Sequence, residues 1–537
     1  MSHPASRRSR PAAIRSRLRL VSSVPVSSKR QESFAWGRLL WRLGRRPKRA
    51  LTECPERPIG AKLEITYACN LRCGFCYTDS PRRTLQRTPE LSDEQWRVVL
   101  RESLDLGIVE AVVTGGEPFL RRELTLEAIE TLASAGVGVS LNTNGWFVDE
   151  EVARRLGALR GVTAHVSVDG PRAGLHDASR GVPGSWRRAI EGIDRLLGAG
   201  VGVCAVHVVT PGNAHAVPDF LEQMWTLGVP WVRVTPVVVS GAAARGGDWG
   251  VSREELRKAA GEFEERRGAA MRISVQPGTG GGLSLQGRAA PGSFLVRPNG
   301  DVRPDSLRPF TYGNAIEDGV EACWTALREG WDDERINRWA GAMKGPGDIA
   351  KSGLVPYLDD EIPVVGGVAG PASAKAQSSG ESGPATLSRT DSDSNAGGRD
   401  AEVPAPTPPP SVDPDVELGE AREKVRGLAL ARRYRHTPLR WSGSSEQRFV
   451  RLAGDGRYLR LNESGSVVMD ALDGGAVEDA AGALAARYGL DPDRAVADAI
   501  GAARELLKRR VVLAAGASAP FPAEPGTTDL PGLEPAG

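Results

Sequence analysis

Three cysteines share one short loop: Cys69, Cys73 and Cys76 are separated by three and then two residues. Three thiolates at this spacing can ligate three irons of a [4Fe-4S] cluster and leave the fourth iron open to a small molecule. A zinc site would need a fourth Cys or His nearby, and buried structural thiols would not gather on the polar stretch 70–72. The loop is therefore predicted to hold one [4Fe-4S] cluster, with these cysteines as its metal ligands and catalytic centre.

The segment around this loop alternates short β-rich runs with longer helical ones, from residue 63 to residue 239. This alternation is typical of βα units and a parallel sheet. Ser92 and Gln95 form a capping-box pattern that predicts the start of the first helix. Six units predict an α/β fold, a partial (β/α)6 TIM-like barrel whose chemistry lies at the carboxyl ends of the strands. The expected strands are 63–68, 111–114, 137–142, 163–168, 203–209 and 232–239.

The cysteine loop resembles the signature of the radical S-adenosylmethionine (SAM) superfamily, C-x-x-x-C-x-aromatic-C, with Phe75 in the aromatic place. The second expected strand ends in Gly115-Gly116-Glu117-Pro118, which matches the GGEP motif of that superfamily. The resemblance implies that the backbone and carboxylate of this motif bind the amino group of SAM. Glycines let a backbone approach a ligand closely, and a carboxylate pairs with an ammonium.

Further motifs follow along the chain in the order that is typical of the superfamily, and they contain Asn144, Ser167, Asp169, Arg180 and Asn213. The resemblance implies that polar groups closing the fourth strand bind the ribose and that Arg180 lies near the methionine carboxylate. Asp and Asn in loops usually form turns, so the inference rests on the ordered recurrence of the motifs. The implied cofactor-binding residues are Phe75, Gly115, Gly116, Glu117, Pro118, Asn144, Ser167, Asp169, Arg180 and Asn213.

Residues 286–345 resemble the SPASM or twitch extension that holds auxiliary clusters in many superfamily members, and they include an expected hairpin at 294–303. Where relatives place cysteines this chain has Asp305, so the extension is predicted to hold no cluster of its own. Cys204 and Cys323 fit buried thiols, and the alternative is a hydrogen-atom donor such as an epimerase needs.

The C-terminal part of the chain is predicted to form a separate unit. Residues 346–416 are rich in Ser, Gly, Ala and Pro and are expected to be a flexible linker, because they cannot bury enough apolar surface to offset their ordering entropy. Residues 417–515 fit a winged-helix-like arrangement. Its expected strands lie near 439 and at 448–452 and 457–461, followed by helices at 463–472, 477–488 and 492–508.

The stretch 458–465 resembles the PqqD-like peptide-recognition element. That family binds a leader peptide as an extra strand on its small sheet, so the resemblance implies a precursor peptide as partner. A DNA-binding winged helix is the alternative, but the basic residues 508–510 gather only at the end of the last helix, where they suit its dipole.

The composition indicates several folded units, because 537 residues exceed what one core holds. A formal net charge of +2 argues against nucleic acid as a partner, and no apolar run is long enough to span a membrane. Clustered thiols in a long chain point to a reducing compartment, hence the cytoplasm. Residues 1–58 are expected to be a disordered basic segment and 516–537 a disordered tail.

The combined prediction is a radical SAM peptide maturase with its barrel at 59–285. The resemblance implies that SAM cleavage at the cluster, fed by a donor such as flavodoxin or ferredoxin, yields a 5′-deoxyadenosyl radical. This radical removes hydrogen from a ribosomally made precursor, and the favoured outcome is a side-chain crosslink. The alternatives are epimerisation, a small-molecule or cofactor-biosynthetic radical enzyme, and an iron-sulfur winged-helix regulator that binds DNA.

Overall fold

The structure is a computed structural model of the 537-residue chain. It describes residues 19–21, 54–86, 89–267, 271–276, 290–341, 362–363, 413–436, 441–443, 447–451, 458–508 and 511–514. Within these ranges no helix is long and apolar enough to cross a membrane.

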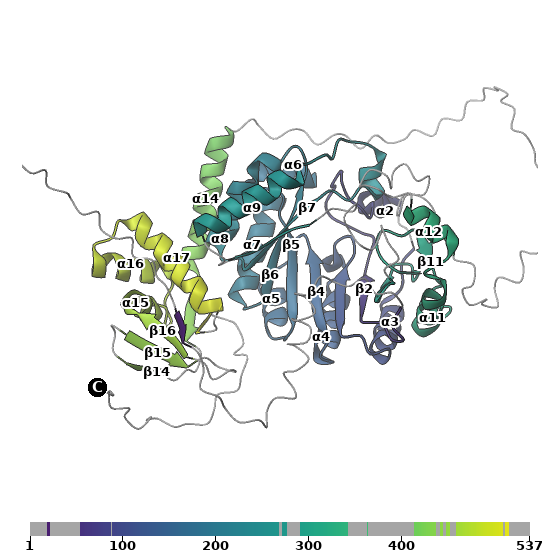
Figure 1. The fold of residues 1–537 in the computed structure, drawn as a ribbon, viewed down its shortest axis with the longest axis horizontal. Helices are drawn as coiled ribbons and strands as arrows, with labels where there is room; N and C mark the ends of the chain where they lie inside the picture. The colour runs from purple at the N-terminus through teal and green to yellow at the C-terminus, as the bar shows by residue number, and fades with distance from the viewer. Residues whose placement is uncertain are drawn as a thin grey trace, which may run out of the picture.

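A nine-stranded sheet forms the body of the molecule (Figure 1). Its order is β10-β9-β2-β3-β4-β5-β6-β7-β8, and every pair is parallel except β9 with β10. The end strands do not pair with each other, so the sheet is open, which confirms the α/β class and the partial barrel. The bounds are β2 Gly60–Glu64, β3 Glu110–Thr114, β4 Gly138–Thr143, β5 Val162–Ser167, β6 Gly202–Val209, β7 Trp231–Pro236, β8 Arg272–Val275, β9 Ser293–Val296 and β10 Val302–Arg303.

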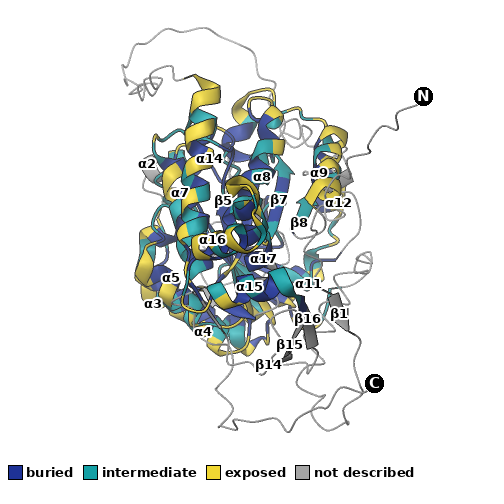
Figure 2. Ribbon diagram, turned by 90° about the vertical axis from the view of Figure 1, so that its left-hand side faces the viewer, coloured by how far each residue is buried: buried dark blue, intermediate teal, exposed yellow. Residues whose placement is uncertain are grey.

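Helices between the strands bury the sheet, and Figure 2 shows buried strands inside and exposed residues on the outward helix faces. The predicted capping box starts α3: Gln95 N donates to Ser92 Oγ at 3.2 Å and Ser92 N to Gln95 Oε1 at 2.8 Å. The helices are α2 Ser80–Gln86, α3 Asp93–Asp105, α4 Arg122–Ser134, α5 Glu150–Gly157, α6 Ala173–Arg180, α7 Ser185–Gly198, α8 Val217–Leu227 and α9 Arg253–Arg267. Short 3-10 turns follow three strands, at η1 Pro118–Arg121, η2 Ala214–Ala216 and η3 Gly241–Arg245.

Two parts of the sheet differ from the prediction. The first strand, β2, runs over residues 60–64 rather than 63–68, because the backbone of 66–68 bonds instead to the loop after β3. The edge strand β8 was not predicted at all. Its four residues are too few for an alternation of polar and apolar side chains to stand out.

The segment after the barrel packs on it and shares its core. β9 and β10 form the predicted hairpin, and β9 extends the sheet beside β2. Helix α11 (Val320–Gly330) lies against α3, where Val320 N donates to Glu102 Oε2 at 2.8 Å. Two short strands, β11 Phe310–Thr311 and β12 Ile362–Pro363, pair in parallel, and α12 covers Glu334–Gly341. The assignment of this segment to the SPASM or twitch class stays a prediction.

A second hydrophobic core defines the C-terminal unit. The predicted pattern of strands followed by three helices is present, although the weak strand expected near 439 lies outside the described residues. The elements are β13 Tyr434–His436, β14 Trp441–Gly443, β15 Gln447–Arg451, β16 Tyr458–Asn462, α15 Glu463–Ala471, α16 Val477–Tyr488, α17 Pro492–Lys508 and β17 Val512–Ala514.

The sheet of this unit gains a strand from the far end of the chain. Its order is β1-β16-β15-β14, and β1 (Arg19–Val21) pairs antiparallel with β16. The register places Leu20 opposite Leu459. This strand lies within the segment 1–58, for which no strand was predicted.

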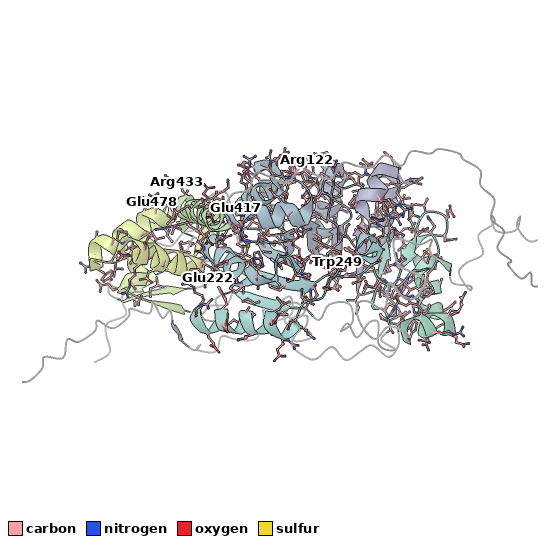
Figure 3. The ribbon with its side chains drawn as sticks, turned by 90° about the horizontal axis from the view of Figure 1, so that it is seen from above. Arg122, Glu222, Trp249, Glu417, Arg433 and Glu478 are labelled. Carbon is pink, nitrogen blue, oxygen red and sulfur yellow. The ribbon has the colours of Figure 1, made fainter. Side chains whose placement is uncertain are left out.

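Helix α14 (Pro414–Ala431) connects the two units and packs against the barrel beside α8 (Figure 1). It begins inside the range predicted as linker, with Asp413 as its N-cap. Lys424 pairs with Glu191 of α7 at 3.1 Å. Glu417, labelled in Figure 3, pairs with Arg172 at 3.3 Å and accepts a hydrogen bond from Gly174 N. The last residues of the predicted linker, 414–416, are therefore part of a helix that packs on the barrel.

Two buried arginines fasten the C-terminal unit to α7 and to the end of α8. Arg432 pairs with Asp194 at 2.6 Å and donates to the Leu227 carbonyl at 3.0 Å. Arg504 donates to the Val229 carbonyl at 3.0 Å and stacks on Trp225, which packs against both cores. The C-terminal unit is thus held in one position against the barrel.

We expect Arg432→Ala to loosen this contact. The substitution leaves Asp194 without its partner and the Leu227 carbonyl without this donor, which should cost about 3–5 kcal/mol at the interface. Small-angle scattering should show a larger radius of gyration, and limited proteolysis should cut sooner near α14.

Arg422→Ala is the control, because the pair of Arg422 with Asp219 is exposed and contributes less than about 1 kcal/mol. An Arg432→Ala chain as compact and as protease-resistant as this control would show that the arginine does not hold the units together.

Candidate active site

The cysteine loop lies directly after β2 in a small apolar cluster of its own. Cys73 is 8% exposed, and Cys69 and Cys76 are half-buried; none of them forms a disulfide. Val208 of β6 and Val237, just after β7, pack against the loop. The carboxyl ends of the strands therefore enclose the three thiols, as the sequence predicts.

The Gly-Gly-Glu-Pro turn packs directly on the chain that leads into the cysteine loop. Gly116 N donates to Thr66 O at 2.7 Å, and Glu117 N donates to Ala68 O at 2.8 Å. A Cβ on Gly116 would lie 2.1 Å from Ala68 O, so only glycine fits there. The turn thus fixes the position at which the loop begins.

Glu117 lies inside this turn and is fully buried. Its carboxylate accepts hydrogen bonds from Thr143 Oγ1 at 2.8 Å and from Asn144 N at 2.7 Å. Burial raises the pKa of Glu117 to about 7, and these donors oppose that shift. That this carboxylate binds the amino group of SAM stays a prediction. In the structure it joins the ends of β3 and β4, and the half-buried Gly115 and Gly116 present backbone beside it.

Asp169 and Arg180 form a buried ion pair behind the loop, with 2.6 Å between the closest nitrogen and oxygen. The Asp169 carboxylate also accepts from Val208 N at 2.9 Å. Arg180 Nη1 donates to Cys73 Sγ at 3.8 Å, and its guanidinium lies 5.3 Å from the Phe75 ring. Burial is the largest single influence on the pKa of Asp169 and raises it, but the Arg180 charge together with His207, His176 and the Val208 N–H outweighs burial, so the net pKa is lowered. Both side chains are therefore charged.

The remaining predicted cofactor residues converge on the same place. Asn144 donates to Asn70 Oδ1 of the cysteine loop at 2.8 Å. Asn213 is buried and donates to the carbonyls of Asp169 and Val208, both at 3.0 Å, so it braces the strand ends. Ser167, at the end of β5, is half-buried.

Two positions that the sequence analysis missed hold the far side of the loop. Asp79 is buried with φ at 52°, and both of its carboxylate oxygens accept from Arg245 at 2.6 Å. Ala242 N donates to Cys76 O at 2.9 Å, and a Cβ on Gly241 would lie 2.5 Å from Tyr77 O. These partners stand more than 160 residues away in the chain, so no local pattern could have revealed them.

The thiols fit an iron-sulfur cluster in number and type. Burial raises the pKa of the Cys73 thiol to about 11, which the Arg180 charge opposes, and burial also raises the pKa of Cys69. The free Cys69 and Cys73 thiols are protonated near neutrality, so binding iron there must release protons. Within the described ranges no group of three His, Cys, Asp or Glu side chains converges to hold a single metal ion. A cluster needs no such convergence, because each cysteine ligates its own iron.

Comparison with known proteins identifies the class. Residues 63–224 match the model of the Radical SAM superfamily, and residues 447–512 match that of Coenzyme PQQ synthesis protein D (PqqD). The mycofactocin maturase MftC of Mycolicibacterium smegmatis is 30% identical over 49% of this chain and 69% of its own length. The chain therefore belongs to the radical SAM superfamily, whose members use a [4Fe-4S] cluster and SAM. More particularly, it combines a radical SAM barrel with a C-terminal PqqD domain.

Other relatives match over shorter parts. The sporulation killing factor maturation protein SkfB of Bacillus subtilis is 31% identical over 35% of this chain and 45% of its own length. The PqqA peptide cyclase of Granulibacter bethesdensis is 25% identical over 40% of this chain and 56% of its own length. The chain thus spans about half the length of several curated relatives that it matches. The crystal structure of Streptococcus suis SuiB aligns at 15% identity and a TM-score of 0.44, over 60% of this chain and 75% of that chain.

We expect Asp169→Asn to destabilise the barrel. The substitution leaves the Arg180 guanidinium buried without a counter-charge, a change that typically costs about 3–5 kcal/mol. Thermal unfolding followed by circular dichroism should show a lower midpoint. The control is Asp149→Asn, which removes an exposed pair with Arg122 worth less than about 1 kcal/mol and keeps the helix cap.

The effect should depend on pH in one direction. Because the folded-state pKa of Asp169 is lowered, its stabilisation is present above the unfolded aspartate pKa of about 3.9. It is lost as the pH falls through the lowered folded-state value. A difference between wild type and Asp169→Asn that persists unchanged in strong acid would contradict the ion-pair account.

Proposed function

We propose that this protein is a cytoplasmic radical SAM maturase that modifies a ribosomally synthesised precursor peptide, most directly by installing a side-chain crosslink. The observation that carries the proposal is the docking of a PqqD domain, through α14, Arg432 and Arg504, on the same barrel that encloses the cysteine loop. A fixed recognition domain delivers its peptide to one place, and this suits an enzyme that must return to the same core residues.

In this proposal Cys69, Cys73 and Cys76 hold one [4Fe-4S] cluster. Bound there, the cluster and SAM supply an electron transfer that cleaves the sulfonium and a 5′-deoxyadenosyl radical that removes a hydrogen atom from the peptide. Gly115 and Gly116 present backbone to the amino group of SAM, and Glu117 positions that backbone. The apolar cluster around the loop excludes water from the reacting groups.

The other predicted cofactor residues divide into two roles. Ser167, which is half-buried at the end of β5, is the proposed ligand of the ribose. Asp169 and Asn213 are engaged with the chain's own groups and act as positioning residues, and Arg180 keeps a positive charge beside Cys73. A small electron carrier such as flavodoxin or ferredoxin is the proposed reductant.

The β16 edge is the proposed site for the leader peptide. This edge accepts an antiparallel strand, since β1 of the same chain pairs there through residues 458–460. A leader would take the place of β1 and form the same kind of backbone hydrogen bonds.

The crosslink is favoured over epimerisation by the position of the thiols outside the loop. An epimerase needs a hydrogen-atom donor within reach of the peptide. Cys204 and Cys323 are both fully buried, and burial raises the pKa of each thiol to about 12. Cys204 lies on the inner face of the barrel sheet but is fully covered there, and Cys323 lies in the core, so quenching by either thiol would require local opening.

The first test is anaerobic reconstitution with iron and sulfide, followed by SAM and a strong reductant. We expect wild type to bind about four irons per chain and to release 5′-deoxyadenosine, measured by chromatography. The Cys69→Ala, Cys73→Ala, Cys76→Ala variant should do neither, and Cys54→Ala, outside the loop, should behave as wild type. A reconstituted wild-type cluster that cleaves no SAM, even with a precursor peptide encoded beside the gene, would refute the proposal.

Removing β1 should strengthen strand addition at β16. Leu20→Pro prevents regular pairing, whereas Ser28→Pro lies outside the strand and is the control. A labelled synthetic peptide of residues 14–26 should bind the Leu20→Pro chain at least about tenfold more tightly than wild type by fluorescence anisotropy, because the tethered competitor is gone. Equal affinities would show that β1 does not compete for this edge.

A further inference from the structure

A row of four neighbouring side chains crosses the barrel sheet near its open edge. The strand registers place His165 of β5 beside Cys204 of β6, Cys204 beside Trp231 of β7, and Trp231 beside Arg272 of β8. Arg233 lies two residues further along β7 on the same face. β7 and β8 form that open edge of the sheet (Figure 2).

This row lies on the inner face of the barrel sheet; His165 and Cys204 are buried, Trp231 is half-buried, and Arg272, on the edge strand β8, is exposed. Along β6 the side chains alternate: Val203 and Ala205 belong to the core with the helices, whereas Val208 packs against the cysteine loop. Cys204 has the same parity as Val208, so the row points to the face that carries the loop. Cys204 lies roughly 13 Å from Val208 along β6, at about 3.3 Å per residue. Arg233 lies about 7 Å nearer than Trp231 to the end of the sheet that carries the cysteine loop.

Two cations share one indole in this row. The guanidinium carbon of Arg272 lies 4.5 Å from the Trp231 ring centroid and that of Arg233 lies 5.0 Å away. In the part of the chain that the structure describes, no aspartate or glutamate pairs with either guanidinium, although Lys62 on the same face pairs with Glu64 at 3.5 Å. The sequence segments 268–270 and 277–289 that flank β8 contain no acidic residue.

Unused hydrogen-bond donors accompany these charges. Trp231 Nε1 and Arg233 Nε are buried N–H groups that reach no acceptor among the described residues. Burial lowers the pKa of His165 to about 4, and the Arg233 charge adds to that shift, so His165 stays neutral. His165 packs edge-on to Trp231 at 5.2 Å. The row is thus rich in positive charge and donors and lacks an anion.

We propose that Arg233, Arg272 and Trp231 form a binding site for a carboxylate of the peptide substrate, either an acidic side chain or the C-terminal carboxylate of its core. The inference rests on the proposed peptide-modifying function and names a feature of its substrate. A carboxylate accepts hydrogen bonds from a guanidinium fork in a planar, two-point arrangement, which fixes orientation as well as position. A core peptide anchored in this way would present one carbon to the cysteine-loop end of the barrel.

The test uses four small probes and saturation-transfer NMR on the full chain. N-acetyl-glutamate α-amide carries a side-chain carboxylate, and N-acetyl-alanine carries a terminal one. N-acetyl-glutamine amide and N-acetyl-alanine amide are their neutral counterparts. We expect one carboxylate probe to bind wild type more tightly than its neutral counterpart, and the stronger of the two identifies the source of the carboxylate.

Substitutions of Arg233 and Arg272 test whether these two arginines bind the carboxylate probe. The Arg233→Gln, Arg272→Gln variant should bind the preferred probe at least about tenfold more weakly, since hydrogen bonds to charged groups are lost. The Arg233→Lys, Arg272→Lys variant keeps the charge without the fork and should fall between the two. Arg266→Gln is the control, because Arg266 lies on the outer helix α9 and pairs with Glu222.

Three outcomes would overturn the inference. Neutral and carboxylate probes could bind alike, or the Gln variant could bind the carboxylates as wild type does. The Gln variant could also lose SAM cleavage in the absence of any peptide, which would assign the arginines to the cofactor instead. Absence of SAM cleavage in wild type would refute the proposed function alone, because the probe-binding result does not depend on it.

Discussion

The buried pair of Asp169 with Arg180 is the interaction on which the arrangement of the site depends. Its carboxylate joins the end of β5 to the backbone of β6, and its guanidinium reaches the sulfur of Cys73. A charge buried at this depth is costly unless it is paired, so neither partner can be lost without disturbing the other. The pair thereby ties the geometry of two strand ends to the electrostatic environment of the cysteine loop.

Much of the barrel follows from local pattern. Short β-rich runs, the capping box at Ser92 and the order of the motifs predict the parallel sheet and its functional end, because each signal is contained in a few neighbouring residues. The cysteine and Gly-Gly-Glu-Pro motifs locate the site for the same reason. What they do not reveal is how their side chains are used: Glu117 carries a carboxylate suited to an ammonium, yet the fold surrounds it with donors from β4.

The features that sequence did not predict depend on distant contacts. Arg245 reaches Asp79 across 166 residues, and β1 reaches β16 across more than 400. Strand β8 is too short to show periodicity, and the start of α14 is obscured by the Pro- and Ser-rich composition that precedes it. For Arg245 and for β1 the stabilising partner is selected by the tertiary fold, which no local sequence pattern reveals.

Helix α14 changes what the long segment between the two units has to do. Because α14 and Arg432 already set the distance between the barrel and the PqqD domain, the stretch 364–412 between β12 and α14 need only connect two points whose separation is fixed elsewhere. Loop-closure entropy grows slowly with length, so residues can be gained or lost there at little thermodynamic cost. Insertions and deletions among homologous chains should therefore accumulate in this stretch, where they leave the catalytic geometry unchanged.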